Sequence, residues 1–151
     1  MGGFENPEYL SAKAALSYTF YLQGHLDEAE NYQREVRDVR LELWGEQHVE
    51  TLGAVRHLAK ARYLQGHLGE AAELQEKALF GMQMLLGENH PETLSNREEL
   101  SHTYHDQGLL QGAEELRRQV AKERETLWGR DHGRILQSME AFSRKHQGFA
   151  H

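Results

Sequence analysis

Apolar residues recur along the chain at steps of three, four and seven residues, which is the spacing of one face of an α-helix. Within a predicted helix of about residues 27–44, this face holds Ala29, Val36 and Leu43. Apolar residues occupy the same positions 42 and 84 residues later: Ala71, Ala78 and Leu85, then Ala113, Val120 and Leu127. A fixed period between about 20 and 50 residues is typical of a repeat array. The chain is therefore predicted to be all-α and built from about three copies of one helical unit.

One short sequence marks the end of a helix in every period. Tyr-Leu-Gln-Gly-His-Leu stands at residues 21–26 and again at 63–68, and a looser copy stands at 105–110. Glycine adopts the left-handed backbone conformation without steric cost, so each copy is expected to turn the chain back into a second helix. The first helix is expected to begin near Asn6, a favourable N-cap residue, and to end at Gln23. Each unit is therefore predicted to be a helical hairpin.

A second glycine segment links one predicted hairpin to the next. Residues 44–48, 86–90 and 128–132 share the pattern of a large apolar residue, glycine, two polar residues and histidine. The glycine suits a helix end, and the histidines are expected to tie the link to a neighbouring helix rather than to bind a metal. We therefore predict a single domain that ends in a lone C-terminal capping helix, which covers the apolar face of the last repeat. The predicted boundaries are 1–151 for the domain, about 6–47, 48–89 and 90–131 for the hairpins, and 132–148 for the capping helix.

Composition and charge narrow the class of protein. Of the 151 residues, 38% are apolar and 27% are charged, with 2 prolines, which suits a helical protein that folds in water. The absence of cysteine excludes disulfides, thiolate metal sites and cysteine nucleophiles, and it is compatible with the cytoplasm, where we place the chain. A net charge of -7 argues against nucleic acid as a partner. No apolar run approaches the length of about 18 residues that crosses a membrane, so no membrane association is expected.

The linked motifs resemble those of a known repeat family. The sequence Gly-Glu-x-His-Pro-x-Thr-Leu and the Gln-Gly turn after it are most complete over residues 87–116, and residues 45–74 repeat them with Val49 in place of proline. These residues resemble the tetratricopeptide repeat family, in the 42-residue form of kinesin light chains and of fungal and bacterial signalling proteins. The resemblance implies a right-handed superhelical solenoid in which the first helix of each hairpin lines a concave groove. The chain departs from the family at Arg62, where an aromatic residue is usual.

By the register of that resemblance, the groove holds a different kind of side chain in each repeat. The first repeat contributes aromatic residues, the second mainly basic ones, and the third acidic and histidine residues: Tyr18 and Tyr21, then Arg56, Lys60 and Tyr63, then Glu98, His102 and His105. Aromatic residues and arginine are the side chains most enriched at binding hot spots. We therefore predict a protein–protein interaction module that holds a peptide or protein segment with an acidic residue beside an apolar or aromatic one.

A structural role is the alternative function. The chain would then be a self-associating solenoid fragment of a larger signalling protein, with homo-oligomers formed through its exposed ends. Phe149 and the apolar positions of the first and last helices favour this alternative. In that case the groove is an ordinary solvated face.

Metal binding and catalysis are not expected. His102, His105 and Asp106 share one helical face, but they lack a fourth ligand, so we interpret them as groove surface and predict neither a metal nor a cofactor. Glu98 and Glu99 are neighbours that point in different directions on a helix. No serine has a recognisable nucleophile setting. The chain is therefore predicted not to be an enzyme.

Overall fold

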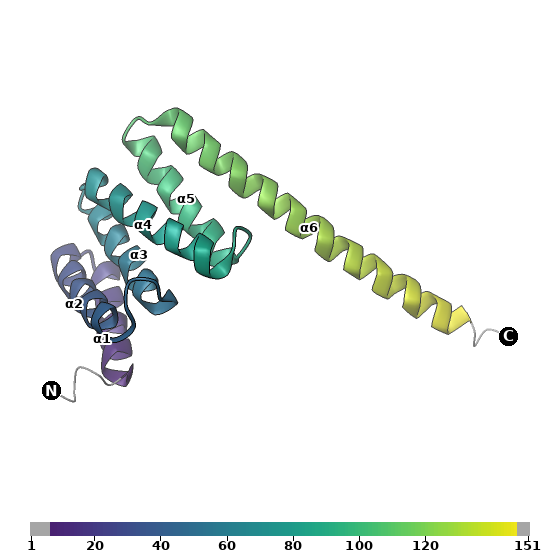
Figure 1. Cartoon of the computed structure of the whole chain (residues 1–151), viewed down its shortest axis with the longest axis horizontal. Helices are drawn as coiled ribbons and strands as arrows, with labels where there is room; N and C mark the ends of the chain where they lie inside the picture. Colours follow the sequence, from purple (N-terminus) through teal and green to yellow (C-terminus); the bar gives the residue numbers. More distant parts are fainter. Residues whose placement is uncertain (1–6, 148–151) are drawn as a thin grey trace.

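The computed structural model describes residues 7–147, and this part of the chain consists of six α-helices without strands (Figure 1). Consecutive helices pack against one another as antiparallel pairs, which confirms the predicted all-α helical repeat. The proposed N-cap Asn6 and the apolar Phe149 lie outside the described residues. The helices are α1 (Pro7–Leu22), α2 (Leu26–Trp44), α3 (Val49–Leu64), α4 (Leu68–Leu86), α5 (Pro91–Asp106) and α6 (Leu110–Gln147).

Left-handed glycines reverse the chain at every turn between these helices. Gly24, Gly66 and Gly108 close the first helix of each hairpin, with φ angles of +81°, +86° and +83°. Gly45 and Gly87 close the second helix of the first two hairpins, with φ angles of +82° and +94°. A residue with a Cβ atom is strained at such angles, so the periodic glycines fix where the helices end.

Histidines begin the helices that follow the first two links. The Nδ1 atom of His48 accepts a hydrogen bond from the backbone N–H of Glu50 at 3.1 Å. His90 accepts the equivalent bond from Glu92 at 3.2 Å. Each bond satisfies one of the unpaired N–H groups in the first turn of a helix. These two histidines therefore have a local structural role, in agreement with their interpretation from the sequence.

Small residues let neighbouring helices approach closely. Ala29, Ala71 and Ala113 occupy the same position in successive repeats, and at most 1% of each is exposed. Leu58 and Leu100 also share a position, where 3% and 2% are exposed, because each packs beneath the preceding hairpin. Every repeat thus completes its core with its neighbour.

An ion pair occupies the position where the family usually has an aromatic residue. The Arg62 guanidinium lies 3.1 Å from the carboxylate of Glu30 and 3.2 Å from that of Glu70. Glu30 is 7% exposed, so its carboxylate needs a partner. The departure at Arg62 is therefore compensated inside the first two repeats.

The predicted lone capping helix is wrong. Helix α6 runs without a break through the third link, and its second half extends away from the body of the repeats (Figure 1). Ala113 and Val120 are buried in its first half, whereas no residue from 128 to 145 is buried. The second half of α6 therefore does not cover the last repeat of its own chain.

The third link lacks the signals that start a helix in the other two. Glu50 and Glu92 stand in the first turn after their links, where an acidic residue favours the positive end of the helix dipole. Arg134 stands at the corresponding position of the third link and has the wrong charge. The rings of Trp128 and His132 stack at 4.9 Å, but Trp44 and His48 stack at 5.1 Å across the first link, where the chain turns, so this contact does not distinguish a turn from a continuous helix. The glycine and histidine that repeat in every link are thus insufficient by themselves to end α6.

Alanine substitutions at two glycines test the turn geometry. Gly66 and Gly53 both have open space where a Cβ atom would lie, but only Gly66 has a positive φ angle. Gly66→Ala should lower the free energy of unfolding by about 1–2 kcal/mol because of backbone strain. Gly53→Ala, inside α3, should raise it by about 0.5–1 kcal/mol. Urea denaturation measures both, and equal effects of the two substitutions would contradict the assignment of the turn.

Candidate binding groove

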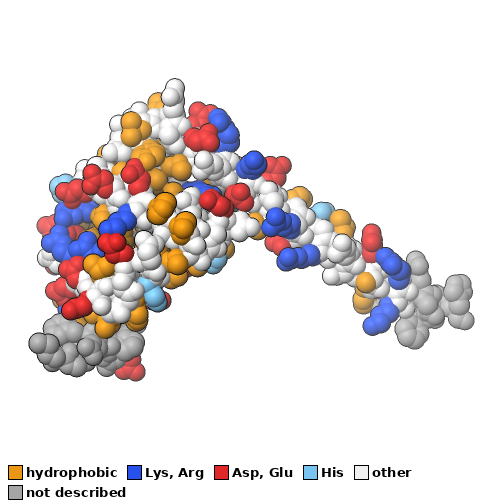
Figure 2. All heavy atoms as spheres, viewed as in Figure 1, with side chains coloured by type: hydrophobic (Ala, Val, Ile, Leu, Met, Phe, Trp, Pro, Cys, Tyr) orange, Lys and Arg blue, Asp and Glu red, His pale blue; other side chains and the backbone are white. Residues whose placement is uncertain are grey.

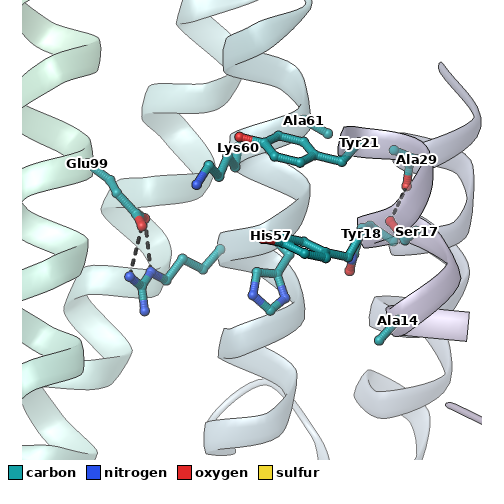
Figure 3. A pocket seen from close by; sticks show the side chains of 11 residues that line it. Ala14, Ser17, Tyr18, Tyr21, Ala29, His57, Lys60, Ala61 and Glu99 are labelled. Carbon is teal, nitrogen blue, oxygen red and sulfur yellow. Dashed lines mark hydrogen bonds and ion pairs between the residues drawn. The ribbon is translucent and has the colours of Figure 1, made fainter. Parts of the chain in front are cut away.

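The first helices of the hairpins line two adjoining cavities. The first cavity, of about 380 Å³, lies between α1 and α3 and is lined by eleven residues that include Arg56, Lys60 and Glu99 (Figure 3). The second, of about 340 Å³, lies between α3 and α5 and is lined by the same three residues among others. We call the two cavities together the groove, because these shared residues make them neighbours. The groove spans all three hairpins.

Two tyrosines form the aromatic end of the groove. The rings of Tyr18 and Tyr21 stack with their centroids 5.9 Å apart. Tyr18 remains 60% exposed, so most of its ring is available for contact. The ammonium group of Lys60 lies 5.4 Å from the centre of the Tyr21 ring, in the position of a cation–π contact (Figure 3). Aromatic and positive surface therefore meet in the first cavity.

The two basic residues of the groove differ in what they contact. Two hydrogen bonds, of 2.9 and 2.8 Å, join the Arg56 guanidinium to the Glu99 carboxylate on α5 (Figure 3). This paired geometry raises the pKa of Arg56 and occupies its charge. No carboxylate of the described residues forms an ion pair with Lys60. Lys60 is therefore the cation of the groove that is open to an acidic group, whereas Arg56 links two repeats.

Two polar residues of the first cavity were not predicted from the sequence. Gln33 comes from α2 and is 7% exposed, and its Oε1 atom has no hydrogen-bond partner in the described chain. His57 also lines the first cavity (Figure 3), and loss of surrounding solvent together with the positive charge of Arg56 lowers its pKa. The sequence repeat could have indicated Gln33 as a groove residue, because Gln75 holds the same position one period later and lines the second cavity. The hydroxyl of Thr103 donates to Gln75 Oε1 at 2.6 Å.

The acidic end of the groove is largely paired within the chain. The Tyr63 hydroxyl donates to the Asp106 carboxylate, a bond that raises the pKa of Tyr63 and lowers that of Asp106. Glu98 forms an ion pair with Arg124 of α6. A basic ligand group would therefore compete with existing partners here.

The predicted groove residues fall into two sets. Most line one or both cavities: Tyr18, Tyr21, Arg56, Lys60, Tyr63, Glu98 and His102. His105 lines neither, and its Nδ1 atom lies 3.5 Å from the Asp106 carboxylate. Across residues 7–147, no three histidine or carboxylate side chains are placed to hold a metal ion. The geometry thus brings together an aromatic surface, an open lysine and an unpaired buried amide oxygen.

Comparisons with known proteins agree with this architecture. A sequence model described as Tetratricopeptide repeat matches residues 10–50 and 51–92. No curated protein matches the chain. A Podosopora anserina protein assigned as a kinesin light chain, with nearly identical TPR-like repeats, has been solved twice. The two structures have TM-scores of 0.74 and 0.71 at 26% and 27% identity, and cover 83% and 82% of this chain.

A third solved structure shares the fold at lower identity. BtubC (BKLC) from P. vanneervenii has a TM-score of 0.77 at 23% identity over 83% of this chain. The chain spans 59% of each Podosopora anserina chain and 50% of the BtubC chain.

The fold and the groove define a helical-repeat protein of the kind that generally serves as a protein-interaction scaffold. The chain belongs to the tetratricopeptide repeat family and is similar to kinesin light chain-like repeat proteins. Relatives of this type are typically not enzymes. Within residues 7–147, no helix combines the length and the apolar character that crossing a bilayer requires.

A substitution that removes one charge and keeps the side-chain shape tests whether the Arg56–Glu99 pair holds the repeats together. Glu99→Gln should lower the free energy of unfolding by about 1 kcal/mol, because the half-buried Arg56 loses its charged partner. Glu73→Gln is the control, because Glu73 is exposed on α4 and should change stability by less than about 0.5 kcal/mol. The comparison is made by denaturant unfolding at low and high salt. Identical stability of the two variants would contradict a stabilising role of the pair.

Proposed function

We propose that the groove binds an extended peptide or protein segment in which an acidic residue stands next to an aromatic or other large apolar residue. The observation that carries this proposal is that two adjoining cavities, which share Arg56, Lys60 and Glu99, extend across α1, α3 and α5. A single segment can therefore contact all three hairpins at once. Contacts spread over several repeats give both affinity and a defined direction of binding.

The open lysine accounts for the acidic residue of the ligand. Lys60 has no ion-pair partner in the described chain, whereas Arg56 is held by Glu99. A ligand carboxylate can therefore approach Lys60 without displacing an existing pair. Charges of this kind set orientation and association rate more than affinity.

The two tyrosines account for the apolar residue of the ligand. The exposed ring of Tyr18 stacks on Tyr21 directly beside Lys60 in the first cavity. A large side chain placed against Tyr18 gains contact area at little cost in conformational entropy. An acidic residue and an apolar residue close together in sequence match this arrangement.

This function requires neither catalysis nor a cofactor. The chain acts as a scaffold whose partners are proteins or peptides, in the cytoplasm, without nucleic acid or membrane. The pairing of Glu98 and Asp106 within the chain leaves the third repeat less selective for a basic ligand residue than their charges suggest.

Selection from a random peptide library tests the proposed specificity. Peptides bound by the full chain should be enriched in Asp or Glu adjacent to aromatic or large aliphatic residues. For a selected peptide, Tyr18→Ala should raise Kd by about thirtyfold or more, since an aromatic anchor is worth about 2 kcal/mol. Lys60→Gln should raise Kd less, and added salt should remove its effect.

Substitutions on the outer side of α4 provide matched controls for this selection. Phe80 is an exposed aromatic residue and Lys77 an exposed lysine, and neither lines the groove. Phe80→Ala and Lys77→Gln should leave Kd unchanged. If these variants reduce binding and the groove variants do not, the ligand binds elsewhere. If no peptide is selected, the proposed function is wrong.

The lowered pKa of His57 predicts how binding depends on pH. The imidazole is mostly neutral near pH 7 in the free groove, and a nearby ligand carboxylate favours its protonated form. Binding is then coupled to proton uptake, so affinity should rise roughly two- to fivefold as pH falls from about 7.5 to 6. His57→Gln should remove this dependence, whereas His67→Gln, outside the groove, should keep it. Calorimetry in two buffers of different ionisation enthalpy measures the proton uptake, and its absence would exclude the coupling.

A further inference from the structure

The second half of α6 exposes the positions that are buried in the other repeats. Leu58 and Leu100 are 3% and 2% exposed, but Phe142, one period after Leu100, is 64% exposed. Val55 is 6% exposed, and Met139, two periods later, is 62% exposed. Residues 133–147 thus carry the apolar pattern of the first helix of a fourth repeat, with its core face in solvent.

The first half of α6 exposes the surface that would receive such a helix. In α4, Ala72 and Leu79 pack against Leu100 of the following hairpin. One period later, the position of Leu79 is held by Ala121 and that of Ala72 by Glu114, and both are exposed. Alanine is smaller than leucine and Phe142 is larger than Leu100, so these two changes compensate in volume. At Ala121 the receiving surface therefore fits the apolar face of residues 133–147 by register and by size, and Glu114 stands at its edge.

The two surfaces cannot meet within one chain in this structure. Helix α6 is continuous, and each residue advances it by about 1.5 Å. Ala121 and Phe142 are therefore separated by about 30 Å along the same helix. A second copy of the chain can place both surfaces in contact, because its own α6 carries the same pair.

We propose that two copies of the chain pair through antiparallel α6 helices, so that residues 133–147 of each copy complete the third repeat of the other. Matching Ala121 with Phe142 in this antiparallel arrangement also matches Trp128 with Ile135. These four residues recur at intervals of seven and supply one of the two positions per heptad that a seam between paired helices uses; the other position holds Met139 near the end of the seam and Asp131 or His132 at its centre. Trp128 and Ile135 are 67% and 57% exposed, so apolar side chains flank the centre on both sides. The two-fold axis then passes near residues 131–132, and each interface patch contacts its own copy.

The distribution of charge along the chain also favours a second copy as the partner. Basic side chains stand out along the extended half of α6 (Figure 2), where residues 129–147 contain four Arg or Lys and two Asp or Glu. The whole chain has a net charge of -7, so the rest of it is strongly acidic. The basic extension of one copy is therefore attracted to the acidic body of the other.

Light scattering coupled to size-exclusion chromatography tests the pairing on the full chain. The mass should be that of a dimer, and Ile135→Glu with Met139→Glu should convert the chain to a monomer with an unchanged helical circular dichroism spectrum. Both residues are exposed, so the substitutions leave the fold of one copy intact. Gln137→Glu with Ala141→Glu is the matched control, because it adds two charges to the opposite side of the same helix and should leave the dimer intact. A monomeric wild-type chain would overturn the proposal.

Thiol crosslinking distinguishes the exchange of helices from other arrangements. The chain has no cysteine, so Ala121→Cys in one copy and Ser143→Cys in a mass-tagged copy introduce single thiols. After the two variants are mixed and equilibrated, a short bifunctional reagent should join residue 121 of one copy to residue 143 of the other. Crosslinks only between two copies of residue 143 would show that the extensions pair with each other. A third variant carries both substitutions in one chain. Crosslinks that form only within this chain would show that α6 folds back, and either result would overturn the proposal.

Discussion

A helical hairpin of this chain buries one side of each helix by itself and needs a neighbour to bury the other. The alanines at 29, 71 and 113 bring the two helices of a hairpin together, while Leu58 and Leu100 are buried only because a preceding hairpin covers them. Leu16 holds the same position in α1 and is 41% exposed, since the described chain has no hairpin before it. Stability in such an array is a sum of units and of nearest-neighbour interfaces. The unsatisfied surfaces therefore collect at the two ends.

The groove follows from the same constraint, because stacking hairpins places their first helices side by side along one face. Polar and charged groups of the groove then lie close enough to pair across repeats, as Arg56 does with Glu99 and Tyr63 with Asp106. Each such contact stiffens the stack and also removes a group from ligand recognition. Selectivity of the proposed binding would accordingly rest on the few groups that the stack leaves open, chiefly Lys60 and Tyr18.

Local chemistry made much of this predictable from the sequence. Glycines at 24, 66 and 108 located the turns because only glycine adopts their left-handed angles without strain, and the period then assigned most groove positions. Pairing across repeats was not predictable from the sequence. Arg56 and Glu99 are 43 residues apart, and their contact depends on how α3 and α5 are rotated relative to each other. The continuity of α6 was missed because the glycine at 129 matched the spacing of a turn, while Arg134 replaces the acidic residue that stands in the first helical turn after the other two links. Spacing shows where a turn is allowed, and the neighbouring charges decide whether it forms.

Pairing through α6 would also change what the groove can do. The groove lies on α1, α3 and α5, and residues 133–147 of the partner would take the place of the next first helix beside α5, so they would extend the groove. A dimer would present two grooves at a fixed separation set by two rigid helices. For a partner that carries two suitable segments, the second binding event becomes intramolecular, and avidity can exceed the affinity of one groove by about 10² or more. A groove of modest affinity would then select partners by the spacing of their segments as well as by their chemistry.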